Sequence, residues 1–155
     1  MKKNSIKVLS QNKKSSYLYF LSDFLECGIE LKGTEIKSLR KSGASLTDAY
    51  VLIKDNEAFI INMHISPYDK GNIFNHDPLR NRKLLMHKHE IRKYKQKIEQ
   101  KGFTGVVTKV YLKSGLAKVE IALGKGKKLV DKRETIKKRE DEREISKVIK
   151  ENRKR

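Results

Sequence analysis

Apolar and polar residues alternate along several short stretches of the chain, and this period of two is the pattern of half-buried β-strands. Four of these stretches pair into two predicted β-hairpins, which span residues 49–65 and 103–123. In the second hairpin every other residue from Val119 through Ile121 to Leu123 is apolar. We therefore expect one face of that strand to be buried and the other to meet solvent.

The N-terminal part of the chain adds two more predicted strands. A polar, basic arm leads into a short strand near residues 6–9, and a long curved strand is predicted over residues 17–31, where both faces are partly apolar. Gly28 lies inside the long strand. A glycine at such a position indicates either a β-bulge or the close approach of another part of the backbone.

Two helices are predicted between the strands. Residues 33–41 form a short helix that Ser42 and Gly43 end, and residues 84–100 form a longer one. The long helix is predicted because apolar and partly apolar side chains recur there at helical spacing. These side chains are Leu84, His87, Ile91, Tyr94 and Ile98. Residues 66–82, which contain both prolines, are predicted to be a loop.

The elements follow one another as strand, short helix, hairpin, helix and hairpin, without a βαβ crossover. This order predicts a mainly β protein, an OB-fold-like antiparallel β-barrel with flanking helices and a basic C-terminal tail. The body is expected at residues 1–124 and the tail at residues 125–155.

The tail carries fourteen Lys or Arg residues, seven Asp or Glu residues and only six large apolar ones. So little apolar surface cannot offset the entropy lost when the segment orders. Good helix formers fill it, with no proline and no glycine after Gly126. We expect a tail that is disordered or frayed when free and becomes helical against a highly negative partner.

Charge points to the class of that partner. The chain has 155 residues and a formal net charge of +18, which selects a nucleic acid or another anionic surface. No apolar run is long enough for a membrane span, and the start is not followed by the apolar core of a signal peptide, so neither a membrane partner nor secretion is expected. The single cysteine, Cys27, excludes an internal disulfide and fits a cytoplasmic location.

The sequence shows no constellation of residues for catalysis, for a cofactor or for a metal. Cys27 has no nearby histidine and is expected in the core. His87 and His89, two residues apart on the predicted helix, should point to different sides and share no metal. Glu26, Glu30 and Glu35 are too dispersed for a carboxylate pair, and a solvated face is the simplest interpretation of each. The chain is therefore not expected to be an enzyme.

Basic residues from separate segments are the stronger signal, because together they supply charge that neutralises phosphates. Outside the distal tail these residues are Lys13, Lys14, Arg80, Arg82, Lys83, Lys118, Lys125, Lys127 and Lys128. Aromatic side chains also offer stacking faces for bases, although core packing is the favoured role for most of them. They are Tyr17, Tyr19, Phe20 and Tyr50.

From these observations alone the prediction stops at an OB-like RNA-binding protein. A ribosomal protein or an initiation-type factor fits equally well. An RNA-modifying enzyme is disfavoured because catalytic residues are lacking.

Four ordered motifs then carry a family resemblance. Residues 33–40, Gly-Thr-Glu-Ile-Lys-Ser-Leu-Arg, resemble a signature of the SmpB family, the SsrA-binding proteins of bacteria. Residues 48–50 with 64–68, residues 77–85, and residues 125–133 with their Lys-Gly-Lys-Lys and Asp-Lys-Arg strings are similar to the same family. The similarity runs from about Asn12 to the C-terminus.

The resemblance implies an OB-fold protein that binds transfer-messenger RNA and stands in for the anticodon stem that this RNA lacks. It implies that the tail becomes helical in the empty mRNA channel of a stalled ribosome, where the complex adds a degradation tag and frees the ribosome. The implied partners are transfer-messenger RNA, the RNA of the decoding site and mRNA channel, and indirectly elongation factor Tu, which delivers the complex. A monomer is expected.

The same resemblance assigns individual residues. The positions that contact or support RNA in the family fall on Asn12, Lys13, Glu26, Leu85 and Lys118. The ribosome-dependent tail positions fall on Lys125, Gly126, Lys127, Lys128, Asp131, Lys132, Arg133, Val148 and Ile149.

The tail departs from the family pattern at two positions. Val130 stands where many members have histidine, and Asp141 where many have tryptophan. Ring stacking on RNA bases from residue 130 is therefore impossible in this chain.

Overall fold

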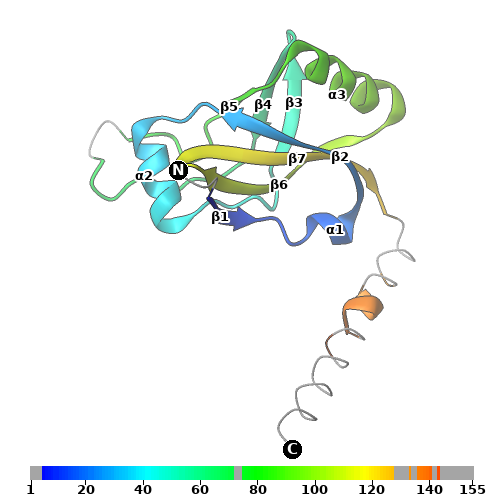
Figure 1. Cartoon of the computed structure of the whole chain (residues 1–155), viewed down its shortest axis with the longest axis horizontal. Coiled ribbons are helices and arrows are strands. Elements are labelled where there is room, and N and C mark those ends of the chain that lie inside the picture. Colours follow the sequence, from blue (N-terminus) through cyan, green and yellow to red (C-terminus); the bar gives the residue numbers. More distant parts are fainter. Residues whose placement is uncertain (1–4, 72–74, 128–132, 134–135, 141–142, 144–155) are drawn as a thin grey trace, which may run out of the picture.

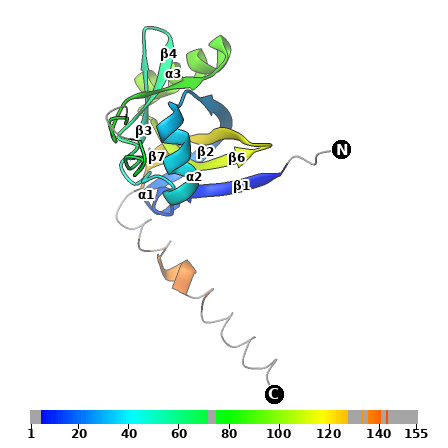
Figure 2. The ribbon, with the colours of Figure 1, turned by 90° about the vertical axis from the view of Figure 1, so that its left-hand side faces the viewer.

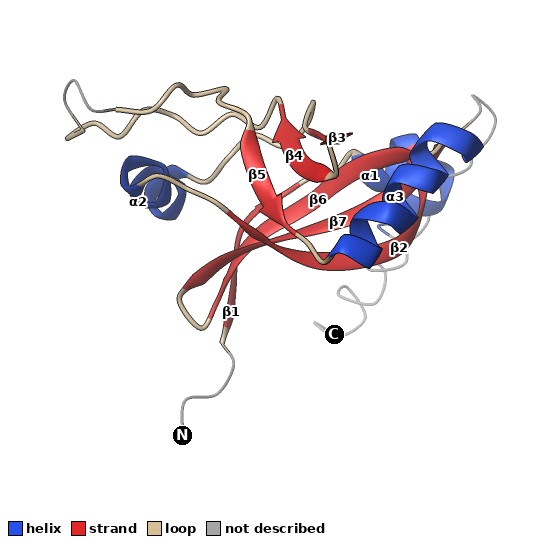
Figure 3. Ribbon diagram, turned by 90° about the horizontal axis from the view of Figure 1, so that it is seen from above, coloured by secondary structure: helices blue, strands red, loops and turns tan. Residues whose placement is uncertain are grey.

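The computed structural model of the chain describes residues 5–71, 75–127, 133, 136–140 and 143. Antiparallel strands form most of the body, with α2 beyond one end and α1 and α3 at the other (Figures 1 and 3). The strands are β1 (Ile6–Gln11), β2 (Tyr19–Ile29), β3 (Tyr50–Lys54), β4 (Glu57–Ile61), β5 (Arg82–Leu85), β6 (Thr104–Lys113) and β7 (Leu116–Gly126). The helices are α1 (Ser15–Leu18), α2 (Gly33–Ser42) and α3 (Lys88–Lys101).

The strands form a closed ring. Their order is β1-β6-β3-β4-β5-β2-β7, and β7 also pairs with β6. This additional pairing closes a barrel of six strands, β6, β3, β4, β5, β2 and β7, while β1 pairs with β6 outside the barrel. The long β6 pairs with two strands along the same edge. Its first half pairs with β3, where Tyr50 faces Val106, and its second half pairs with β1, where Ile6 faces Lys113. The expected OB-like antiparallel β-barrel with flanking helices is confirmed.

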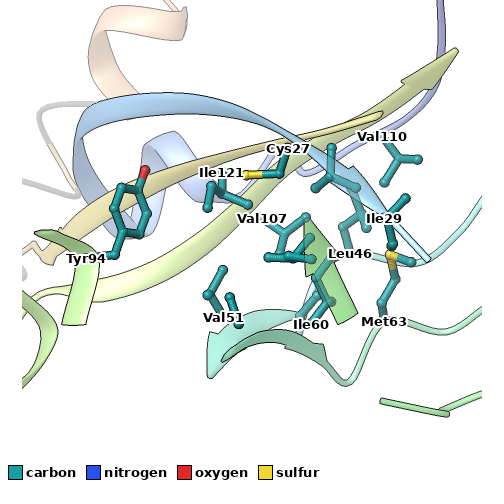
Figure 4. Packing of buried hydrophobic residues seen from close by; sticks show 14 of the residues in the cluster. Cys27, Ile29, Leu46, Val51, Ile60, Met63, Tyr94, Val107, Val110 and Ile121 are labelled. Carbon is teal, nitrogen blue, oxygen red and sulfur yellow. The ribbon is translucent and has the colours of Figure 1, made fainter. Parts of the chain in front are cut away.

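Inward-facing side chains of both halves of the barrel fill its interior (Figure 4). Cys27, Ile60, Val107 and Ile121 are at most 2% exposed, so the prediction that the cysteine belongs to the core is confirmed. Tyr94 reaches this core from α3 and closes one end of the barrel (Figure 4). Removing these side chains from water is the main force that stabilises such a fold.

The long predicted helix begins later than expected. Leu84 and Leu85 belong to β5, and α3 starts only after His87. In β5 the buried Leu84 faces Ile29 of β2 on one side and Ala58 of β4 on the other. Leu84 therefore belongs to a strand, although its spacing also fits the apolar stripe of the predicted helix. The prediction of a helix from residue 84, and of a loop through Arg82, was wrong at this boundary.

His87 marks the true start of α3. Its backbone N–H donates to the Glu90 carboxylate at 2.9 Å, which completes a capping box at the helix N-terminus. The rings of His87 and His89 stack with centroids 5.6 Å apart. The expectation that the two side chains point to different sides was wrong, because His87 precedes the helix.

The predicted long strand over residues 17–31 is divided. Its first residues form the short helix α1, and the strand β2 begins at Tyr19. The register of β2 on β7 shifts between Ser22 and Leu25, with Asp23 at φ 50°. At this bulge the backbone oxygen of Asp23 accepts a hydrogen bond from Tyr94, and its carboxylate pairs with Lys97 at 2.5 Å. Donation by Lys97 lowers the pKa of Asp23. The ion pair connects α3 to β2.

Glu35 of α2 is fully buried, which overturns the expectation of a solvated carboxylate. It pairs with Arg82, whose side chain is also fully buried, and with Arg80 at 2.6 Å. Burial alone would raise the pKa of Glu35, but donation by Arg80, by the Lys32 backbone and by Arg82 lowers it. Arg82 also donates to the Met63 carbonyl at 2.6 Å, so this network joins α2, the start of β5 with the loop before it, and the segment that follows β4.

Two of the four aromatic residues are more exposed than predicted. Phe20 is 53% exposed and Tyr50 is 38% exposed, so core packing was the wrong interpretation for these side chains. Tyr17 and Tyr19 are half-buried. An exposed ring next to lysines is available to another cation or to a base.

Candidate RNA-binding surface

Glu26 and two residues of β6 form a polar cluster on the outside of the barrel. The Tyr111 hydroxyl donates to Glu26 Oε2 at 2.5 Å, and Lys113 Nζ lies 3.3 Å from Glu26 Oε1. Donation by Tyr111, with further help from Lys113, lowers the pKa of Glu26 and keeps this carboxylate ionised near neutral pH. Burial and the same contact raise the pKa of Tyr111, so the tyrosine remains a donor.

The sheet register adds Lys118 and Leu85 to this cluster. Gly28 of β2 faces Lys118 on β7 and Leu85 on β5. A Cβ atom at Gly28 would lie only 3.2 Å from the Leu85 Cβ, so glycine permits this close pairing, as its position in the sequence indicated. Leu85 is 51% exposed. Residues predicted on three separate segments therefore meet at one place.

The turn after β1 borders the same side of the barrel. Asn12 holds this turn, because its side-chain amide donates to the carbonyls of Leu46 and Val107 at 3.2 Å each. Lys13 and Lys14 follow and are exposed. A groove of about 440 Å³ adjoins this turn. Its lining includes Asn12, Lys13, Lys109 and Glu120 of the body, and Arg139 and Arg143 of the tail. Glu120 faces Glu26 in the β2–β7 register, so the groove leads to the cluster.

We call the continuous region of Asn12, Lys13, Lys109, Glu26, Tyr111, Lys113, Lys118 and Leu85 the basic face. Lys109, Tyr111 and Lys113 were not predicted from the sequence. The hairpin predicted over residues 103–123 could have indicated Tyr111, because a turn at Ser114 and Gly115 places it opposite Lys118.

The basic cluster around β5 is divided. Arg82 has no exposed side-chain surface and pairs with Glu35, so it cannot reach a phosphate in this structure, and its predicted RNA contact is not supported. Arg80 is 28% exposed and also pairs with Glu35. Lys83 lies 3.2 Å from the Glu57 carboxylate at the surface. Burial distinguishes Arg82 from Arg80 and Lys83, a difference that the pattern of charges in the sequence could not reveal.

The first predicted tail residues belong to the sheet. Lys125 and Gly126 pair with Phe20 and Tyr19, so β7 ends later than predicted. Arg133 is helical and exposed. Lys127, which follows β7, is also described. The remaining predicted tail positions lie outside the described residues: Lys128, Asp131, Lys132, Val148 and Ile149.

Comparison with known proteins shows which family the chain resembles. The sequence profile described as SmpB protein matches residues 9–151. The chain belongs to the SmpB family. An SsrA-binding protein of Caldanaerobacter subterraneus subsp. tengcongensis is 54% identical over 96% of this chain and 94% of its own length. An SsrA-binding protein of Caldicellulosiruptor bescii is 53% identical over 97% of this chain and 95% of its own length.

A solved structure extends the similarity to three dimensions. A chain from the work described as "tmRNA-SmpB: a journey to the center of the bacterial ribosome" superposes with a TM-score of 0.68 at 41% sequence identity. The match covers 84% of this chain and 95% of the other. The SmpB family is thus supported both by sequence and by fold.

Two further observations concern the described residues only. None of their helices is long and apolar enough to cross a membrane. Among them, His, Cys, Asp and Glu side chains do not gather in groups of three or more that could hold a metal ion.

Proposed function

We propose that this chain binds transfer-messenger RNA through the basic face, stands in for the missing anticodon stem of that RNA and brings it to stalled ribosomes for peptide tagging and ribosome rescue. The observation that carries the proposal is the meeting of Glu26, Leu85 and Lys118 around Gly28. Membership of a family whose relatives are SsrA-binding proteins supports the choice of RNA. The proposed activity is binding rather than catalysis.

The tail has a separate role in this proposal. It enters the mRNA channel and folds there against ribosomal RNA, since its charge fits surrounding phosphates and its apolar content does not support a core of its own. Delivery by elongation factor Tu, action as a monomer and a cytoplasmic location complete the proposal. The similarity to a chain from the work described as "tmRNA-SmpB: a journey to the center of the bacterial ribosome" supports the choice of transfer-messenger RNA and the ribosome as partners.

Direct binding is the first test of the proposal. Labelled transfer-messenger RNA is titrated with the full chain while an equal mass of bulk tRNA competes. Preferential binding of transfer-messenger RNA supports the proposal. Equal binding of both RNAs would instead support a general OB-like RNA-binding protein.

Binding is expected to weaken steeply with salt. Four lysines of the basic face, Lys13, Lys109, Lys113 and Lys118, can each neutralise a phosphate. Each such contact contributes roughly 0.7 to 0.9 to the fall of log K with log salt, which gives a slope of roughly 3. Fluorescence titrations at several salt concentrations measure this slope. A slope near zero would contradict a phosphate-based interface.

Glu26→Ala is expected to weaken binding of transfer-messenger RNA roughly tenfold, the factor for about 1.4 kcal/mol, because Lys113 and Tyr111 lose the group that positions them. The contacts with Tyr111 and Lys113 favour this positioning role over direct acceptance from a base. Tyr111→Phe removes the hydroxyl and should reproduce part of the loss.

Glu30→Ala is the matched control for Glu26→Ala, since Glu30 is an exposed acid just beyond the same strand. Both alanine variants remove one negative charge, so a general electrostatic effect would alter them alike. Thermal melts should remain close to that of the unaltered protein. Equal or tighter RNA binding by Glu26→Ala would show that its carboxylate is incidental.

A further inference from the structure

Two lysines tie the beginning of the tail to the body. We call Lys125–Lys127 the tail root. The Lys127 backbone N–H donates to the Leu18 carbonyl at 3.0 Å, and its Nζ donates to the Ser16 carbonyl at 2.8 Å. The same Nζ lies 4.9 Å from the ring centroid of Phe20, within cation–π range. Lys127 is therefore held by α1 and by Phe20 near the start of β2.

Lys125 is held by a different helix. Its Nζ donates at 2.8 Å to the carbonyl of Lys101, the last residue of α3. It also lies 5.1 Å from the ring centroid of Phe103. Carbonyls at a helix C-terminus lack partners within the helix and attract cations, so this position suits a lysine. The tail root is thus attached to two helices at once.

A third contact comes from farther along the tail. Arg139 Nη2 lies 2.5 Å from Ser16 Oγ, so α1 also contacts a described helical residue of the tail. In Figures 1 and 2 this part of the tail, drawn in orange, lies on the side of the molecule where α1 is found. The short helix α1 therefore accepts three hydrogen bonds from the tail: two on the backbone carbonyls of Ser16 and Leu18, and one on the Ser16 hydroxyl.

The other end of α1 adjoins the basic face. The Ser15 hydroxyl donates to the Asn12 carbonyl at 2.7 Å, and the Ser15 backbone N–H does so at 3.3 Å. Asn12 and Lys13 thus share one rigid turn with the helix that holds the tail root. A displacement of α1 would move both.

We propose that α1 and the C-terminal end of α3 form a docking surface for the chain's own tail root, and that Lys125 and Lys127 orient the tail instead of contacting transfer-messenger RNA. The functional part of this inference rests on the proposed function. Both lysines carry charge that a nucleic acid would attract, but the contacts described above hold each of them against the body. Attachment to two separate helices restricts rotation of the segment more strongly than attachment to one.

A distance measurement tests the docking directly. Nitroxide labels are placed on the full chain at Glu99→Cys in α3 and at Lys137→Cys in the tail, both exposed positions. The native Cys27 can stay, because it is 2% exposed and burial raises its pKa to about 12. We expect a narrower distance distribution in the otherwise unaltered chain than in variants that lose a docking contact, because a docked tail root restricts the positions open to a tail that folds fully only on the ribosome. Lys127→Met, Lys125→Met and Phe20→Leu should each broaden it.

The same variants without labels are then assayed for RNA affinity and for tagging on stalled ribosomes. Tagging is expected to fall about two- to fivefold per variant, the factor for loss of one contact of cation–π strength, while RNA affinity stays within about twofold. Lys54→Met is the matched control, since Lys54 is an exposed lysine at the end of β3. It should change neither distance nor tagging.

Three outcomes would overturn the inference. These are unchanged distances in Lys127→Met and Phe20→Leu, broadened distances with normal tagging, and RNA affinity that falls as much as tagging does. The last would place the lysines in the RNA interface. Failure of the proposed function looks different: the unaltered protein would neither prefer transfer-messenger RNA nor support tagging, while the distances would still report the docking.

Discussion

Glu35→Gln is expected to lower the free energy of unfolding by about 3–5 kcal/mol, the cost of breaking a buried ion pair from one side. The substitution leaves the fully buried Arg82 guanidinium without its carboxylate. Glutamine has nearly the same shape, so the loss comes from uncompensated charge rather than from a cavity. Urea denaturation followed by circular dichroism measures the change.

Glu57→Gln provides the control for this prediction. Glu57 pairs with Lys83 at the surface, where such pairs contribute at most about 1 kcal/mol. Loss of less than about 1 kcal/mol in Glu35→Gln as well would show that the buried carboxylate does not support the fold.

The pH dependence of stability should agree in sign. The folded-state pKa of Glu35 lies below its ordinary value of 4.5, so its contribution is present above pH 4.5 and is lost as the pH falls through the folded-state pKa. The unaltered protein should therefore lose stability on acidification in this range. Glu35→Gln should lose less, because residue 35 no longer titrates.

A protein that ends at Lys127 is expected to lose tagging on stalled ribosomes while binding transfer-messenger RNA within a few-fold of the full chain. The physical reason is that the basic face lies entirely on the body, whereas the removed segment carries most of the charge proposed to fold against ribosomal RNA. RNA affinity and tagging are measured on the same preparation, so that loss of protein cannot imitate loss of function.

Charge reversal separates the chemistry of the tail from its length. Lys132→Glu with Arg133→Glu should copy the tagging defect, while Lys54→Glu on the body turn should not. Normal tagging by the truncated protein would refute the division of labour between body and tail. Complete loss of RNA binding would instead show that the tail belongs to the RNA-binding surface.

Local patterns predicted most elements because their causes are local. Alternation along each strand found both hairpins, and the Gly43 stop marked the end of α2. The same logic failed at β5, whose four residues are too few to display a period and whose Leu84 also matches a helical stripe. Pairing with β2 and β4, distant in sequence, decided that segment.

The site shows the same division. Motif resemblance named Glu26, Leu85 and Lys118, but their adjacency arises only when β5, β2 and β7 pair around Gly28. Tyr111 and Lys113 join them through the sheet register, and the contacts of Glu26 indicate a positioning role that its type alone left open.

The sequence by itself determined the class of partner, the family and both hairpins, because net charge, motifs and alternation are properties of the chain. Only the tertiary structure decided which charges are available. Arg82 and Glu35 read as surface charges yet lie buried against each other, and Lys127 reads as part of a free basic tail yet bonds to α1. Burial and pairing depend on residues far apart in sequence, so closure of the barrel separates the charges that hold the fold from those that remain to bind RNA.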